Sequence, residues 1–86
     1  MSLSKTFQAL GDPNRQKILS LLKKKDMAVG DILEHFSLTG ASLSHHLAIL
    51  KQADLISSRR DGQRIIYTIN LSVLEEVMES FAKFIK

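Results

Sequence analysis

The amino-acid sequence predicts a mainly α-helical fold that contains one β-hairpin. Three observations support this fold class. Apolar residues recur at helical spacing over most of the chain, and after residue 54 the pattern changes to that of strands. Asp61-Gly62 lies inside the strand-like stretch and is a strong hairpin signal, because glycine supplies the positive φ of a tight turn. No internal repeat or linker-like stretch is present, so we expect a single domain over residues 1–86.

Composition limits the class of protein. Hydrophobic residues make up 44% of the chain and charged residues 24%, so we expect a folded core rather than disorder. The chain has no cysteine, which excludes disulfides, thiol catalysis and thiolate metal sites. A small domain without disulfides or a structural metal ion has marginal stability, so we expect self-association. No apolar run is long enough for membrane insertion and no signal core is visible, so we expect a cytoplasmic protein.

Two helices are expected in the first third of the chain. Apolar residues recur at helical spacing over residues 2–10, which form a short helix that Gly11 ends. Asp12 is expected to be the N-cap of the next helix, with Pro13 in its first turn. The lysines at 23–25 suit the negative end of this second helix.

A helix-turn-helix is expected over about residues 29–53. Its first helix carries apolar residues at i, i+3, i+4 and i+7, namely Val29, Ile32, Leu33 and Phe36. Thr39 is placed to cap the second helix, which runs from about Gly40 to Ala53. The buried stripe of that helix is Leu43, Leu47 and Leu50. Two short helices joined by about three residues form this motif.

A basic hairpin, expected over about residues 55–70, follows at once. Its second strand is rich in β-branched and aromatic residues, among which Tyr67 is expected to pack toward the core. A helix-turn-helix followed by such a hairpin is a winged helix-turn-helix. In that fold a helix enters the DNA major groove, and the hairpin arm reaches the flanking backbone or minor groove. The net charge of +3 is by itself weak evidence for a nucleic-acid partner.

Candidate DNA contacts lie on the second helix of the motif and around the hairpin turn. They are Thr39, Ser42, Ser44, His45, Lys51, Arg60, Gln63 and Arg64. The helix residues lie off the leucine stripe and face outward, so the alternative is simple solvation. We favour base and phosphate contact because a basic wing follows. For Lys51, simple solvation is as well supported as phosphate contact. Arg15 is expected to contact either a phosphate or an internal carboxylate. His46, at the edge of the stripe, is expected to be a hydrogen-bonded structural residue.

The last helix, expected over about residues 71–85 with Asn70 or Ser72 as its cap, has a wide apolar arc. The arc is wider than a monomer of this size needs, and an exposed arc of this kind usually marks an interface. Its candidate interface residues are Leu74, Val77, Met78, Phe81 and Ile85.

Several short segments, taken in order along the chain, are similar to those of a known protein family. They are Leu10 to Arg15 with Ile18-Leu19, Ser44 to Leu47 with Leu50-Lys51, Leu55-Ile56, Gly62 and Tyr67. Together they resemble the ArsR family of bacterial winged-helix repressors over nearly the whole chain. Within it, residues 42–47 and 62–63 most resemble the metal-independent branch that includes the repressor of the sporulation-delay operon. The resemblance implies a homodimer formed by the first and last helices, which adds Leu3 and Phe7, and an inverted-repeat operator.

Metal sensing, common in that family, is not expected. The family's thiolate site would need cysteines where Ala28 and Gly30 stand, and its other common site needs histidines that the last helix lacks. We therefore expect no metal and no cofactor. Release from DNA would then depend on a sequestering protein, on a small-molecule inducer, or only on dilution and turnover of the repressor.

Two other classes of function were weighed. An enzyme is not expected, because the sequence has neither a glycine-rich phosphate loop nor the histidine and carboxylate spacing of a metallohydrolase. A winged-helix protein-interaction module without sequence-specific DNA binding is the stronger alternative. It would be marked by an uncharged wing and a second helix without short polar side chains. This chain instead has a positively charged wing and short polar side chains on that helix. The favoured prediction is a sequence-specific repressor of double-stranded DNA that acts as a homodimer.

Overall fold

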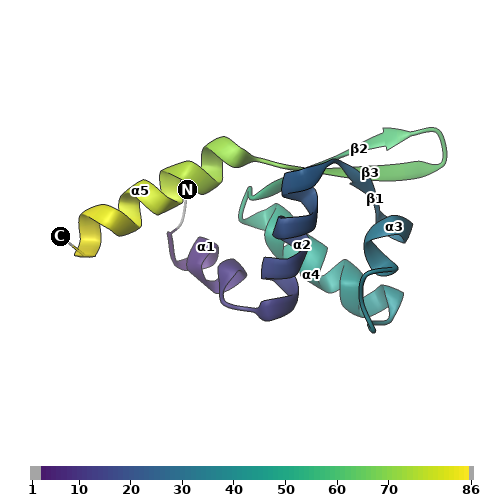
Figure 1. The fold of residues 1–86 in the computed structure, drawn as a ribbon, viewed down its shortest axis with the longest axis horizontal. Coiled ribbons are helices and arrows are strands. Elements are labelled where there is room, and N and C mark those ends of the chain that lie inside the picture. Colours follow the sequence, from purple (N-terminus) through teal and green to yellow (C-terminus); the bar gives the residue numbers. More distant parts are fainter. Residues whose placement is uncertain (1–2, 86) are drawn as a thin grey trace.

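The computed structural model describes residues 3–85, and the side chain of Leu3 lies outside the described part. The elements follow in the order α1 (Leu3–Leu10), α2 (Pro13–Lys24), β1 (Met27–Ala28), α3 (Val29–Leu33), α4 (Gly40–Gln52), β2 (Ile56–Asp61), β3 (Arg64–Ile69) and α5 (Leu71–Ile85). The mainly helical fold with a β-hairpin is confirmed. In Figure 1 the hairpin extends from one end of the body and α5 extends from the other.

Side-chain caps begin the second and fourth helices as expected. Asp12 accepts hydrogen bonds through Oδ1 from the backbone N–H groups of Asn14 at 2.8 Å and Arg15 at 3.2 Å. Desolvation raises the pKa of Asp12, but these two backbone bonds and the charges of Arg15 and His46 leave it below its ordinary value. Thr39 Oγ1 accepts from the backbone N–H of Ser42 at 3.0 Å. Both caps satisfy donors that a helix leaves free at its N-terminus.

The sheet has one strand more than the expected hairpin. β1 pairs with β3 in an antiparallel manner, matching Met27 with Tyr67 and Ala28 with Ile66, so the strand order is β1-β3-β2. A two-residue strand has no period of its own, and its partner lies about forty residues away in sequence. The turn also falls one residue later than expected. Asp61 belongs to β2, and Gly62, at φ +64°, begins the turn.

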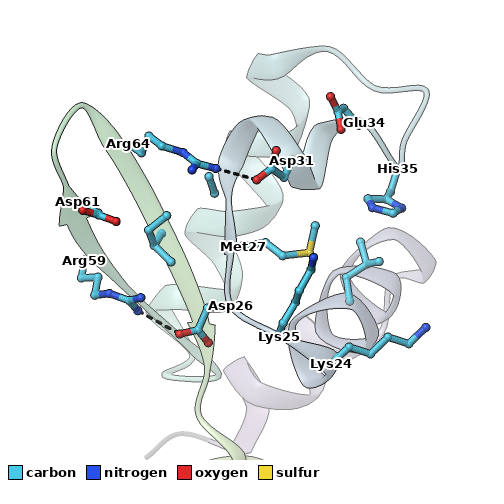
Figure 2. Close-up of a pocket in the computed structure, with 13 residues that line it drawn as sticks. Lys24, Lys25, Asp26, Met27, Asp31, Glu34, His35, Arg59, Asp61 and Arg64 are labelled. Carbon is cyan, nitrogen blue, oxygen red and sulfur yellow. Dashed lines mark hydrogen bonds and ion pairs between the residues drawn. The ribbon is translucent and has the colours of Figure 1, made fainter.

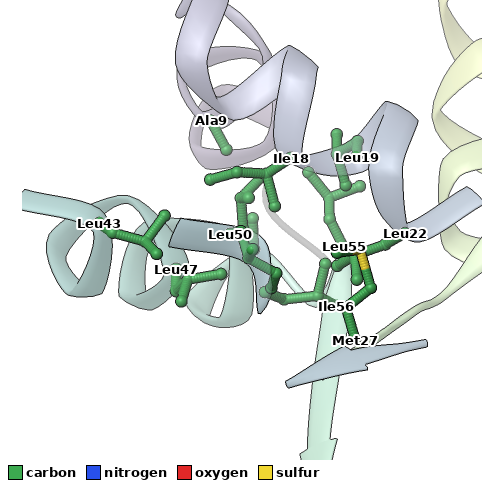
Figure 3. Packing of buried hydrophobic residues seen from close by; sticks show 12 residues of the cluster. Ala9, Ile18, Leu19, Leu22, Met27, Leu43, Leu47, Leu50, Leu55 and Ile56 are labelled. Atoms are coloured by element: carbon green, nitrogen blue, oxygen red, sulfur yellow. The ribbon is translucent and has the colours of Figure 1, made fainter. Parts of the chain in front are cut away.

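One apolar cluster joins α2, α4 and the sheet. Figure 3 shows its residues, which are Ala9, Ile18, Leu19, Leu22, Met27, Ile32, Leu43, Leu47, Leu50, Ala53, Leu55 and Ile56. Tyr67 is half-buried and packs against the cluster, as expected. Phe36 also packs against it, although α3 ends earlier, at Leu33. The leucine stripe predicted for α4 is thus confirmed as core, and it fixes which face of α4 points outward.

A tight junction joins α4 to the wing. Asp54 adopts φ +60°, the N–H of Leu55 donates to Leu50 O at 3.1 Å, and the N–H of Asp54 donates to Lys51 O at 3.0 Å. This is a Schellman ending, in which an aspartate replaces the usual glycine. Asn70 Nδ2 donates to Asp54 O at 2.8 Å, and its Oδ1 accepts from Ser57 Oγ at 2.9 Å. The side chain of Asn70 therefore ties the ends of the wing together instead of capping α5.

Candidate nucleic-acid interface

The outward face of α4 carries short polar side chains. Thr39 at its N-cap is exposed, as are Ser44 and His45, and Ser42 is half-buried. The opposite face carries the buried leucine stripe, so these side chains cannot turn into the core without unfolding the helix. Hydroxyl and imidazole groups on such a face can hydrogen-bond base edges or phosphate oxygens.

His46 and Arg15 form a partly buried link behind this face. Arg15 donates from Nε to Ala9 O at 2.8 Å and from Nη2 to Gln8 O at 3.0 Å. Its Nη1 lies 3.2 Å from His46 Nδ1, and the His46 side chain is only 12% exposed.

The structural role expected for His46 is confirmed by this link. The guanidinium of Arg15 binds carbonyl groups of the last turn of α1, which lack partners within the helix. Its expected contact with a DNA phosphate stays a prediction.

The wing presents its arginines on two faces. Directly paired residues of antiparallel strands share a face, and neighbours along a strand alternate. Arg60 is paired with Ile65 and so lies on one face, while Arg59, paired with Ile66, lies on the other together with the pair of Asp61 and Arg64. Three arginines close in sequence therefore do not form one cationic patch. This division follows from the register of the two strands.

Two of the three arginines are paired with carboxylates of the body. Arg59 Nη1 lies 3.1 Å from Asp26 Oδ2, and Arg64 Nη2 lies 2.7 Å from Asp31 Oδ2. Figure 2 shows both pairs bridging the hollow between the wing and the segment that leads into α3. Hydrogen bonds from Thr68 and Arg59, together with the Arg59 charge, hold the pKa of Asp26 below its ordinary value against a smaller opposing effect of desolvation. The exposed side chains of Arg60 and Gln63 have no ion-pair or hydrogen-bond partner among residues 3–85 that the structure records.

Lys51 is anchored at the end of α4. Its Nζ donates to Ser58 Oγ at 2.7 Å, which joins α4 to β2. The residue is exposed, so its charge still faces solvent. It is thus neither buried nor freely solvated.

The apolar arc of α5 divides into a buried and an exposed part. Val77 is fully buried within the protomer, so including it in an exposed stripe was wrong. Leu74 is half-buried against the core. Four expected interface residues are at least 41% exposed, namely Phe7, Met78, Phe81 and Ile85. The rings of Phe7 and Phe81 meet edge to face, with centroids 5.9 Å apart.

The exposed part of this arc is larger than the set chosen from the sequence. Leu71 and Phe84 are 44% and 85% exposed and extend it at both ends of α5. Helical periodicity finds the arc but cannot separate the side that meets the core from the side that does not. We call the exposed set of Phe7, Leu71, Met78, Phe81, Phe84 and Ile85 the α5 stripe.

No three His, Asp or Glu side chains within residues 3–85 gather closely enough to hold a metal ion. None of the helices described has the length and apolar content that crossing a membrane requires.

Comparison with known proteins places the chain in a family. Residues 12–58 match the family model described as bacterial regulatory protein, arsR family. The chain is 49% identical over 83 residues to the transcriptional repressor SdpR of Bacillus subtilis, with 96% of this chain and 92% of that protein covered. It is 33% identical over 78 residues to the arsenical resistance operon repressor of Staphylococcus aureus, with 91% and 75% covered.

A solved structure with the same fold agrees. It is the homodimeric winged helix-turn-helix DNA-binding domain of a possible ArsR-family transcriptional regulator from Mycobacterium bovis. The TM-score is 0.78 at 28% sequence identity, with 92% of this chain and 74% of that chain covered. The expected fold and family are thereby confirmed, and the chain belongs to the arsR family of bacterial regulatory proteins, as a winged helix-turn-helix regulator of transcription and not an enzyme.

Proposed function

We propose that the protein is a homodimeric repressor that binds an inverted-repeat operator in duplex DNA and does not respond to metal ions. The observation that carries this proposal is the pairing of two exposed surfaces on one small domain. One is the polar face of α4 with the wing beside it, and the other is the α5 stripe. A twofold dimer presents two copies of the reading face, and such a dimer matches a palindromic site.

The two parts of the DNA surface have different tasks in this proposal. Ser42, Ser44 and His45 on α4, with Thr39 at its start, contact base edges and nearby phosphates. The DNA backbone is contacted by the wing residues Arg60, Gln63 and Arg64 and by Lys51 at the end of α4. Phosphate contacts fix the position of the protein, and base contacts give it sequence preference.

The dimer surface consists of the α5 stripe with α1. The terminal turn of α5 carries Phe84 and Ile85 at 85% and 67% exposure, so those side chains gain little from packing within one protomer. A second copy would cover them. The proposed contact also includes Leu3 and Leu74, whereas Val77 supports the stripe from behind.

Metal independence follows from the ligands available. Ala28 at the end of β1 and Gly30 in α3 stand where thiolates would be needed, and α5 carries carboxylates without a histidine. Transition-metal ions bind regulatory sites through thiolate and imidazole groups. Release from the operator would then come from a sequestering protein or a small molecule. Titration with zinc, copper, nickel and cobalt at micromolar levels should leave operator affinity unchanged. A saturable loss of about tenfold, equal to about 1.4 kcal/mol of coupling, would contradict this.

Selection of bound duplexes from a genomic DNA pool tests the function as a whole. Enrichment of an inverted repeat, with half-sites spaced by about one helical turn or a multiple of it, is the expected result. Enrichment of no sequence, with random duplex DNA not retarded at low salt, would favour the protein-interaction module instead.

A further inference from the structure

The ion pair between Arg64 and Asp31 places a proposed DNA-contact residue on an internal carboxylate. Arg64 opens β3 beside the wing tip, and Asp31 lies in the first turn of α3. Their Nη2 and Oδ2 atoms are 2.7 Å apart, which is the short distance of a charge-assisted hydrogen bond. Figure 2 shows the two side chains extending toward each other across the edge of the hollow. The Nη2 donor that Arg64 gives to Asp31 is not available to a phosphate while this bond lasts.

This pair is open to solvent on both sides. The side chains of Arg64 and Asp31 are 60% and 53% exposed. Exposed pairs are weak because water screens the attraction and holding two side chains costs entropy. A phosphate offers the guanidinium the same oxygen acceptors with a comparable charge. The carboxylate can therefore be replaced by phosphate at small cost.

The second pair on the same face is held differently. Arg59 Nη1 is 3.1 Å from Asp26 Oδ2, and the Asp26 carboxylate also accepts a hydrogen bond from the side chain of Thr68 on β3. Arg59 lies farther from the turn than Arg64 does, because it pairs with Ile66 while Arg64 pairs with Asp61. This second pair joins the wing to the body away from its tip, and its side chains are also exposed, at 57% and 44%. It leaves Arg64 as the arginine of this face nearest the tip.

We propose that Asp31 is a positioning residue that holds Arg64 in the DNA-free protein and gives it up to a backbone phosphate of the operator. The inference rests on the proposed function, since it adds a step to the binding of that DNA. Asp31 acts as an internal substitute for phosphate. It keeps the arginine extended toward the body. It also makes the free energy of DNA binding less favourable, because the bond between Arg64 and Asp31 must break when Arg64 moves to the phosphate.

A double-mutant cycle separates this exchange from a general effect of charge. Operator affinity is measured by fluorescence anisotropy for the wild type, Asp31→Asn, Arg64→Ala and the double variant. Glu34→Gln is the matched control, because it removes the same charge from an exposed residue that lines the same hollow. No ion pair of Glu34 is recorded within the described residues.

The expected result is that Asp31→Asn tightens binding about two- to fivefold more than Glu34→Gln does, as a lost exposed ion pair predicts. In the Arg64→Ala background the two neutral substitutions should have equal effects. Weaker binding by Asp31→Asn, or an effect equal to that of the control in both backgrounds, would overturn the proposal. In that case Asp31 either holds Arg64 for DNA in the complex or has no part in binding.

Salt dependence gives a second readout, because its slope counts the phosphates that the protein neutralises in the complex. The slope of log affinity against log salt should be the same for the wild type and Asp31→Asn, because Arg64 reaches phosphate in both complexes. A slope steeper by about 0.9 per protomer in Asp31→Asn would mean that Arg64 stays on Asp31 in the wild-type complex, against the proposal. Wild-type protein that selects no operator would refute the proposed function itself, which is a distinct outcome.

Discussion

Phe81 offers the most direct test of the proposed dimer. It lies in the α5 stripe and is 46% exposed in the protomer. Complete burial of a phenylalanine side chain is worth about 1.5–3 kcal/mol, so covering the exposed part would gain about 0.7–1.4 kcal/mol. A twofold dimer contains the residue twice. Phe81→Ala should therefore weaken dimerisation by about 1.4–2.8 kcal/mol, which is about 10- to 100-fold in Kd.

Phe81→Glu should act more strongly, because a carboxylate would lose its hydration in the interface. We expect a mostly monomeric protein at concentrations where the wild type is dimeric, with operator affinity reduced in parallel. Sedimentation velocity measures the oligomeric state, circular dichroism the fold, and fluorescence anisotropy the binding. Glu79→Ala is the control, since Glu79 is exposed on the other side of α5 and should leave all three unchanged.

The edge-to-face contact with Phe7 complicates a single result at Phe81, because the substitution also removes a contact between α1 and α5 within the protomer. Met78→Glu resolves this. Met78 is 49% exposed, and it is not one of the two rings in that edge-to-face contact. A folded monomer of either variant that binds the operator as tightly as the wild type would refute the reasoning, as would a dimer that persists in both.

Two further predictions concern the reading face and the cap of α2. His45→Ala should change which bases are preferred. Arg60→Ala should weaken binding about equally across sequences and reduce the slope of log affinity against log salt by about 0.9 per protomer. A changed base preference in the arginine variant would show that the wing reads sequence. The lowered pKa of Asp12 means that its contribution to stability is complete above its ordinary value of 3.8 and is lost as the pH falls through the lower folded-state value. The wild type should therefore have a higher free energy of unfolding than Asp12→Asn at pH 5, and this difference should shrink towards pH 2. Urea unfolding measures it, and a difference that stays constant with pH would contradict the prediction.

Local chemistry made most of the fold predictable. Asp12 and Thr39 mark helix starts by residue type alone, and the leucines of α4 mark its buried face by spacing. These signals act over a few residues, so one sequence contains them in full. They also fixed which side of α4 faces outward, and hence the candidate DNA contacts on that helix.

Features set by distant pairing were not predictable. β1 exists because Met27 and Ala28 meet β3, and neither residue alone signals a strand. The burial of Val77 depends on how α5 packs against the body, which periodicity does not specify. Asp54 takes a left-handed conformation that favours glycine, so residue type was misleading there. The partners of Arg59 and Arg64 are each 33 residues away, a separation at which opposite charges carry no signal.

Arg15 shows how such distant contacts join the two proposed surfaces. Its guanidinium holds the last turn of α1, part of the proposed dimer contact, and reaches His46 on the reading helix. The arrangement needs a rigid donor fork with several N–H groups in fixed directions, which lysine cannot supply. His46 faces inward beside the outward-facing His45, so one dipeptide supplies both the internal link and a candidate base contact. The position of the reading face relative to α1 is thus set by a few directed hydrogen bonds as well as by the leucine core.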